Sequence, residues 1–276
     1  MIHGIDISVW QDDNSTAQMM DFAKAKAAGA RFAFIKTSER MAADPDFMMN
    51  WKNAKAAGLP RGGYHFLRWD ISGLYQARVF CALLKDDPGE LPPVADFEAP
   101  IKDGKYPSNA LLWQFLEEVE NLLGRKPMIY TSPGYWSSYG KIKDTSRFDA
   151  KWAYFPLWIA HYTKADKPTV PPPWTAWAFW QYTSTGDGLR YGAESKGLDL
   201  NWFNGDQAEF NALLAQYAPG SEIIEPQPEP GTDPTPPPAG TNDELAESYI
   251  QAEINLLGAR VRQIENYLGS FKAGAA

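Results

Sequence analysis

The sequence predicts an α/β fold of the (β/α)8-like class, a somewhat irregular TIM-type barrel, over residues 1–218. Short apolar segments alternate with longer helical patterns, which is typical of a parallel sheet. Eight strand-like segments fall between residues 2 and 201, a number that favours a closed barrel over an open sheet. The segment 162–176 contains three consecutive prolines and no helical pattern, so we expect the barrel to be irregular there.

The expected elements follow in order along this region. Strands are expected at residues 2–7, 31–37, 62–67, 93–98, 127–131, 156–161, 177–182 and 197–201. Helices are expected at residues 15–28, 45–57, 71–85, 108–123 and 206–216. A partial repeat, Ala-Lys-Ala-Ala-Gly, ends at Gly29 and again at Gly58, each time just before a strand. Both glycines are expected to end a helix, because glycine adopts the left-handed conformation at little cost.

A linker and a further helix are expected after the barrel. Residues 219–241 hold eight of the 22 prolines, so they predict an extended, semi-rigid linker. Residues 242–276 predict a C-terminal helix whose apolar residues are spaced alternately by four and three: Ile250, Ile254, Leu257, Val261, Ile264, Leu268 and Phe271. This heptad pattern favours a coiled coil, and therefore a homo-oligomer formed through the helix. A helix that docks on another protein, or on the barrel, is the alternative.

Charge and composition exclude several classes of protein. The net charge is −8, of which residues 219–276 carry −6, so the barrel is nearly neutral. It offers no basic surface for nucleic acid, and no stretch approaches the length of a membrane-spanning helix. Cys81 is the only cysteine and lies in an apolar run, where we expect a small buried side chain without a catalytic role. The N-terminus has no signal-peptide pattern, so we expect synthesis in the cytoplasm.

Four acidic residues follow expected strands. Asp6 ends the first strand, Asp96 and Glu98 end the fourth, and Asp199 ends the last. Barrel enzymes carry their chemistry at the carboxyl ends of strands, so these side chains are expected to meet at one mouth. Residues i and i+2 of a strand point to the same face, which puts Asp96 and Glu98 together, roughly 6–7 Å apart at Cα.

Closely spaced carboxylates suit cleavage of a glycosidic bond. Mutual repulsion raises the pKa of one carboxyl group and gives a proton donor beside a group that stays charged. Glycoside hydrolysis needs both an acid for the leaving oxygen and an anion for the positive charge at the anomeric carbon. A hard cation such as Mg²⁺ is the competing use of four acids. Because His3, His65 and His161 lack the spacing of a zinc motif, we expect neither a catalytic metal nor a cofactor. His65 is expected to pack or hydrogen-bond in the barrel wall.

These residues lie in segments that resemble the family 25 glycoside hydrolases, the lysozymes of the Chalaropsis and phage endolysin type. The segments resemble that family's strand motifs in order: Gly4-Ile5-Asp6-Ile7-Ser8-Val9-Trp10-Gln11, Phe34-Ile35-Lys36-Thr37-Ser38-Glu39, Gly63-Tyr64-His65-Phe66, Asp96-Phe97-Glu98, Pro156-Leu157-Trp158-Ile159-Ala160-His161-Tyr162, Trp180-Gln181-Tyr182-Thr183-Ser184 and Leu198-Asp199-Leu200-Asn201-Trp202-Phe203. One departure is visible: the family has Ala-Thr-Glu-Gly after the second-strand lysine, whereas this chain has Thr37-Ser38-Glu39-Arg40.

The resemblance implies an N-acetylmuramidase that cleaves the β-1,4 bond from N-acetylmuramic acid to N-acetylglucosamine in peptidoglycan glycan strands. By the same resemblance Glu98 is the general acid. Asp96 stabilises an oxazolinium formed by the substrate's N-acetyl group or positions that group, and Asp6 and Asp199 complete the acidic floor. A direct carboxylate nucleophile remains open. The activity implies action on the bacterial cell wall, after release through a phage lysis system.

Six further residues are expected to support the site. Lys36 ends an apolar strand and is expected to hold Asp6 or its neighbours ionised. The residues expected to line the groove and contact sugar are Tyr64, Tyr130, Trp158, Trp180 and Gln181. Two other functions remain open: a cell-wall-binding or virion structural protein without turnover, and a chitin-type glycoside hydrolase.

Overall fold

The computed structural model describes residues 1–12, 19–102, 104–142 and 145–218. The expected linker 219–241, the C-terminal helix 242–276 and the heptad residues lie outside the described residues, so the coiled coil and the oligomer stay predictions. Among the helices that the structure describes, none combines the length and the apolar character needed to cross a membrane.

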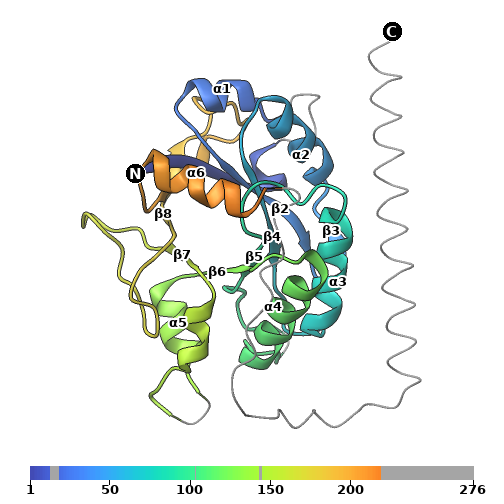
Figure 1. Cartoon of the computed structure of the whole chain (residues 1–276), viewed down its shortest axis with the longest axis vertical. Helices are drawn as coiled ribbons and strands as arrows, with labels where there is room; N and C mark the ends of the chain where they lie inside the picture. The colour runs from blue at the N-terminus through green and yellow to red at the C-terminus, as the bar shows by residue number, and fades with distance from the viewer. Residues whose placement is uncertain (13–18, 103, 143–144, 219–276) are drawn as a thin grey trace. The chain divides into compact units, whose positions relative to one another are not determined.

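The described residues form a mixed, eight-stranded β-barrel with one extra edge strand (Figure 1). The strands are β1 (Ile2–Ile7), β2 (Ala33–Glu39), β3 (Ala42–Ala43), β4 (Arg61–Phe66), β5 (Val94–Asp96), β6 (Met128–Thr131), β7 (Leu157–Ala160), β8 (Phe179–Asp187) and β9 (Gly197–Phe203). Their order is β1-β9-β8-β7-β6-β5-β4-β2-β3, and pairing of β1 with β2 closes the barrel. The predicted barrel is therefore confirmed, and β3 is only an antiparallel edge paired to β2.

The direction of the last strand differs from the prediction. β9 runs antiparallel to both of its neighbours, β1 and β8, whereas the other barrel pairs are parallel. Only a short turn, residues 188–196, joins β8 to β9, and a connection of that length cannot return to start a parallel strand. The expected irregularity is confirmed in residues 162–176, which contain no helix.

Helices cover the outside of the barrel. They are α1 (Phe22–Ala27), α2 (Phe47–Ala56), α3 (Gly73–Leu84), α4 (Asn109–Leu123), α5 (Pro133–Tyr139) and α6 (Gln207–Gln216), with short 3-10 helices η1 (Val9–Gln11) and η2 (Ala150–Tyr154). Five of the α-helices match predicted ones, although α1 begins later than expected, and α5 was not predicted. Gly29 and Gly58 follow α1 and α2 with φ of 116° and 68°, so the expected glycine ends are confirmed.

Strand alternation divides the apolar residues between two cores. One face of each strand points into the barrel, where Phe34, Trp158 and Phe179 pack on one another. The opposite face packs against the helices, as Ile35 and Ile129 do. Cys81 belongs to this outer core, is 3% exposed, and burial raises the pKa of its thiol, so the predicted role as a small apolar side chain is confirmed. The barrel interior is thus filled at one end, which leaves room for a site only at the other.

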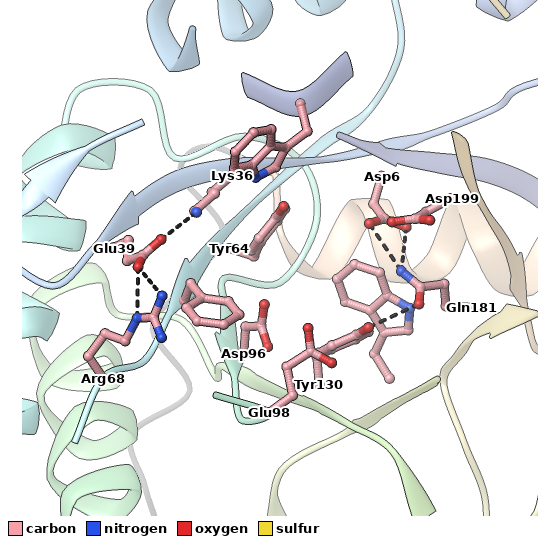
Figure 2. A pocket seen from close by; sticks show the side chains of 13 residues that line it. Asp6, Lys36, Glu39, Tyr64, Arg68, Asp96, Glu98, Tyr130, Gln181 and Asp199 are labelled. Atoms are coloured by element: carbon pink, nitrogen blue, oxygen red, sulfur yellow. Dashed lines mark hydrogen bonds and ion pairs between the residues drawn. The ribbon is translucent and has the colours of Figure 1, made fainter. Parts of the chain in front are cut away.

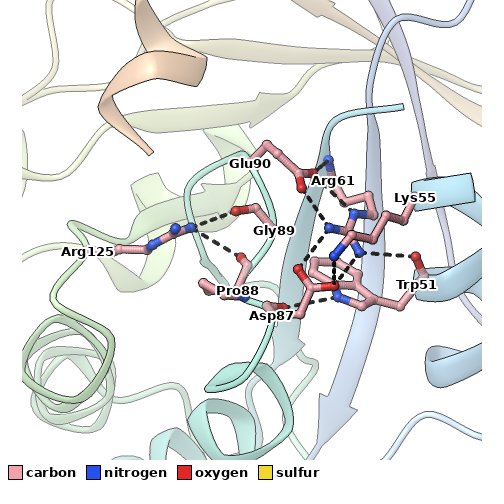
Figure 3. A network of polar contacts seen from close by, with 8 residues as sticks. All are labelled: Trp51, Lys55, Arg61, Asp87, Pro88, Gly89, Glu90 and Arg125. Carbon is pink, nitrogen blue, oxygen red and sulfur yellow. Dashed lines mark hydrogen bonds and ion pairs between the residues drawn. The ribbon is translucent and has the colours of Figure 1, made fainter. Parts of the chain in front are cut away.

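A buried arginine holds the end of the barrel where β4 begins (Figure 3). Arg61 is fully buried, and its guanidinium donates to Asp87 and Glu90 at distances of 2.7–3.2 Å and to the carbonyl oxygen of Trp51. The ring of Trp51 lies 4.5 Å from the guanidinium. This network secures the loop between α3 and β5, and Arg125 donates to the Gly89 carbonyl from the other side.

Replacing Arg61 with methionine is expected to lower the free energy of unfolding by about 2–3 kcal/mol, because Asp87 and Glu90 lose a buried partner but keep some solvent. Urea denaturation measures the change. The control is Lys55→Met, which removes only the 61% exposed partner of Asp87 and is expected to cost less than about 1 kcal/mol. Equal losses for both variants would contradict the role given to Arg61.

Candidate active site

A pocket of about 240 Å³ opens at the carboxyl ends of the parallel strands (Figure 2). Nine of the ten predicted site residues line it. The full lining is Asp6, Trp10, Lys36, Glu39, Tyr64, Phe66, Arg68, Asp96, Glu98, Tyr130, Trp158, Gln181 and Asp199. The missing residue is Trp180, and strand alternation explains why. It is adjacent to Gln181 on β8, so it faces the outer core, where its indole donates to the carbonyl oxygen of His161.

The four predicted acids meet in this pocket, from three strands. Asp96 and Glu98 point into it together, as their i, i+2 spacing predicts, although β5 ends at Asp96. Asp6 and Asp199 are register partners in β1 and β9. Asp199 lies near the start of β9 rather than its end, and it reaches the same mouth only because β9 runs in the opposite direction. Its predicted location is confirmed, while the predicted strand direction behind it was wrong.

Two amide side chains hold Asp6. Gln181 Nε2 donates to both carboxylate oxygens at 3.1 and 3.0 Å, and Asn201 Nδ2 donates to Oδ2 at 2.7 Å. The orientation of each amide is fixed from behind. Trp158 donates its indole N–H to Asn201 Oδ1, while the Tyr130 hydroxyl donates to Gln181 Oε1. Both amide nitrogens must therefore face Asp6, which favours the charged carboxylate.

The carboxyl groups of Asp6 and Asp199 interact directly. Burial raises the pKa of Asp6 to about 6, against the hydrogen bonds from Asn201, Gln181 and Asp199. Burial and the charge of Asp6 raise the pKa of Asp199 to about 8. At neutral pH Asp6 is therefore the anion, and Asp199 keeps its proton and donates it to Asp6.

Glu98 has the properties of a proton donor. Burial, followed by the charge of Asp6, raises the pKa of Glu98 to about 7, and the Tyr130 hydroxyl opposes this rise. The Tyr130 hydroxyl has a single proton, which it donates to Gln181 Oε1 while Glu98 is protonated. A carboxyl group that titrates near neutral pH is suited to general acid catalysis.

Asp96 lies beside Glu98 and has an open acceptor. Burial and the charge of Glu98 raise the pKa of Asp96, whereas the charge of Lys36 lowers it. Its Oδ1 atom is buried and has no hydrogen-bond partner among the described residues. A buried oxygen of this kind is costly unless a ligand supplies a donor. The described residues contain no group of three or more His, Cys, Asp or Glu side chains placed to hold a metal ion.

Lys36 lines the pocket and forms its direct ion pair with Glu39. Its ammonium group donates to Glu39 Oε2 at 2.7 Å, and the expected ion pair with Asp6 is not formed. Its charge still acts on Asp96 through space. His65, by contrast, behaves as predicted: it is fully buried and hydrogen-bonds Ser38 and Gln76, and burial lowers its pKa to about 4.

The aromatic residues differ in their access to a ligand. Trp158 is 2% exposed and its N–H is already satisfied, so it forms the floor of the pocket. Trp10 lines the pocket and is 78% exposed, which makes it the most accessible aromatic face there, and the sequence reasoning missed it. Its place in the first-strand motif was the available signal. Arg68, Glu39 and Phe66 were also missed as pocket residues, because their positions depend on how β2 and β4 pair.

The departure in the loop after β2 has a visible consequence. Arg40 adopts φ of 54°, in the left-handed region that favours glycine, where the family motif has glycine. Its side chain turns outward and pairs with Asp70. Arg40 is therefore not among the residues that line the pocket.

Comparison with known proteins agrees with this geometry. The family model for glycosyl hydrolases family 25 matches residues 5–188, two thirds of the chain. The chain belongs to glycosyl hydrolase family 25. The predicted resemblance is thereby confirmed, and the matched segment contains Asp6, Asp96 and Glu98.

Individual proteins with similar sequences or structures cover the barrel. The uncharacterized protein YegX of Escherichia coli (strain K12) is 32% identical over 220 residues, which are 77% of this chain and 73% of that protein. Lysozyme M1 of Streptomyces globisporus is 33% identical over 228 residues, 79% of this chain and 72% of that protein. The crystal structure of the bacterial lysozyme from Streptomyces coelicolor superposes with a TM-score of 0.65 at 30% identity, covering 79% of this chain and 98% of that one.

Replacing Gln181 with leucine is expected to raise the pKa of Asp6 above about 6, because the charged carboxylate loses a donor. A shift of about one pH unit corresponds to one hydrogen bond to a charged group. With Asp6 neutral, the pKa of Glu98 is expected to fall. Titration of ¹³C-labelled carboxyl groups by NMR measures both values.

The matched control is Tyr162→Phe. It removes a 2.7 Å hydrogen bond to Gln181 Oε1 but leaves both donors on Asp6. The Asp6 pKa is expected to stay unchanged in this variant. A Gln181→Leu protein with the wild-type pKa of Asp6 would contradict the role given to the amide.

Proposed function

We propose that this family 25 protein is a peptidoglycan hydrolase, an N-acetylmuramidase that cleaves the β-1,4 bond between N-acetylmuramic acid and N-acetylglucosamine. The observation that carries the proposal is the place of Glu98 in the pocket lining with Asp6 and Asp96, where burial and the charge of Asp6 raise its pKa to about 7. A pocket used only for binding has no need of a proton donor in this environment. The named lysozymes among its relatives support the same activity.

The proposed reaction begins with proton transfer from Glu98 to the glycosidic oxygen as the bond to the leaving sugar breaks. Positive charge then develops at the anomeric carbon. Asp96 stabilises this charge, either directly or through the substrate's N-acetyl group. Water then forms the new bond to the anomeric carbon and gives its proton to the Glu98 carboxylate, which restores the acid. The unpartnered Oδ1 of Asp96 supports the second route, because an acetamido N–H is a donor that would satisfy it.

Asp6 and Asp199 support the acid rather than contact the bond that breaks. Burial and the charge of Asp6 together raise the pKa of Glu98, and Asp199 shares its own proton with Asp6. Trp10 provides an exposed face for stacking against a sugar ring at the rim. Action at the bacterial cell wall follows from the proposed substrate. The phage-type release route and the oligomeric C-terminal helix stay predictions.

Replacing Glu98 with glutamine is expected to lower kcat on purified peptidoglycan by at least about 100-fold, because the side chain keeps its shape but cannot donate a carboxylic proton. Release of reducing ends measures the rate, and mass analysis of the products checks for muramic acid at the reducing end. The matched control is Glu117→Gln on the exposed surface of α4. Turnover of the Glu98→Gln protein at the wild-type rate would contradict the assignment of Glu98 as the general acid.

The pH dependence of kcat/KM is expected to fall on the alkaline side with a midpoint near pH 7. The active form of Glu98 is the protonated one, and its pKa of about 7 means that this form disappears as the pH rises above that value. Initial rates between pH 5 and 9 on soluble glycan strands measure the profile. A profile that stays flat to pH 9 would show that another group donates the proton.

A further inference from the structure

The pocket contains a second charged group, separate from the four acids. Lys36, Glu39 and Arg68 lie together on one side of the lining, and Asp6, Asp199 and Gln181 lie on the other (Figure 2). The proposed reaction uses none of Lys36, Glu39 and Arg68. The three residues come from the end of β2 and from the segment after β4, and together we call them the basic rim.

The basic rim carries more positive than negative charge. Lys36 Nζ donates to Glu39 Oε2 at 2.7 Å, and Arg68 contacts Glu39 Oε1 through Nε at 2.7 Å and Nη2 at 2.6 Å. Burial alone would raise the pKa of Glu39, but the hydrogen bonds and charges of Lys36 and Arg68 reverse this and hold the pKa below its ordinary value. Glu39 is therefore a single anion between two cations, and one positive charge is left over at the pocket wall.

Both cations are held in place before any ligand arrives. Lys36 Nζ lies 5.3 Å and the Arg68 guanidinium 4.6 Å from the centre of the Phe66 ring. Side-chain exposures of 12% for Lys36 and 26% for Arg68 put them at an accessible wall rather than in the core. A fixed guanidinium retains further N–H donors in its plane, which is the geometry that binds a carboxylate.

The charges around the pocket indicate which kind of ligand the basic rim would bind. The anion of Asp6, together with the acceptor oxygens of Asp96, Glu98 and Asp199, makes the rest of the lining unfavourable for a second anion. An uncharged chitin-type sugar chain meets no such barrier and needs no cation. A sugar chain that carries carboxylates does need one, placed away from the acids that perform the reaction.

We propose that Arg68 and Lys36, bracketed by Glu39, form a subsite that binds a carboxylate carried by the glycan substrate. This inference rests on the proposed function. Two sources offer the same chemistry: the lactyl carboxylate of a muramic acid residue whose peptide is absent, and a carboxylate of an attached peptide.

The test measures binding in the Glu98→Gln protein, so that its outcome does not depend on turnover. Isothermal titration calorimetry gives Kd for glycan strands stripped of peptide, and for the same strands with the lactyl carboxylates converted to methylamides. The second pair of ligands is peptide-bearing strands with free carboxylates and the same strands with those carboxylates converted to methylamides. Arg68 is the residue to change, because the charge of Lys36 also acts on Asp96.

The charged member of at least one pair is expected to bind about tenfold more tightly than its neutral counterpart, as one hydrogen-bonded ion pair at a partly exposed site would give. Arg68→Gln is expected to abolish this preference, and Arg68→Lys to keep part of it. The same measurements are repeated in proteins that also carry Glu39→Gln. This control is needed because Glu39 loses its ion pair when Arg68 is replaced, and its free charge could then repel the ligand. Arg78→Gln, which breaks an ion pair with Glu118 between α3 and α4, is the matched control and is expected to keep the preference.

The outcomes separate the hypotheses. If Arg68→Gln abolishes the tighter binding of charged strands that carry no peptide, the ligand is the lactyl carboxylate. If it does so only for peptide-bearing strands, the ligand is a carboxylate of the peptide. Equal binding of charged and neutral strands, or a preference that survives Arg68→Gln, overturns the subsite. Failure of the wild-type protein to release reducing ends from peptidoglycan overturns the proposed function instead, and leaves the binding result to stand by itself.

Discussion

The chemistry of this pocket depends on one buried carboxylate, that of Asp6, which stays charged beside Asp199 and Glu98. Asp6 keeps its charge because two amide nitrogens face it, from Gln181 and Asn201. Neither amide is free to turn. A reversed amide would place its oxygen against the anion and leave a tyrosine hydroxyl or the Trp158 indole without an acceptor. Burial, together with the charge on Asp6, raises the pKa values of Asp199 and Glu98, so both groups keep their protons to a higher pH than an exposed carboxyl group.

The reversed last strand of the barrel makes this arrangement possible. Because β9 is antiparallel to β1, Asp199 and Asn201 both lie alongside the first strand, one opposite Asp6 and the other two residues away. The acids and the basic rim then occupy different parts of one lining. The barrel interior below them is filled by aromatic rings such as Phe34 and Phe179, so the polar groups are confined to the mouth.

Much of the fold and of the site was open to prediction from local pattern. Alternating strand and helix signals predicted the barrel, and the i, i+2 spacing predicted that Asp96 and Glu98 share a face. The same alternation rule, applied to β8, would have excluded Trp180, whose neighbour Gln181 faces inward. The partner of Lys36 was beyond prediction, because Glu39 is brought to it by a bulge in β2 between Lys36 and Ser38.

The sequence by itself determined which residue types stand at the strand ends, since chemical identity and spacing along a strand are local properties. Those two properties were enough to assign the family and to find all four acids. Only the tertiary structure decided which acid is charged and which is protonated. A pKa depends on burial and on neighbours from distant strands, and the amides that fix Asp6 lie 175 and 195 residues away from it along the chain.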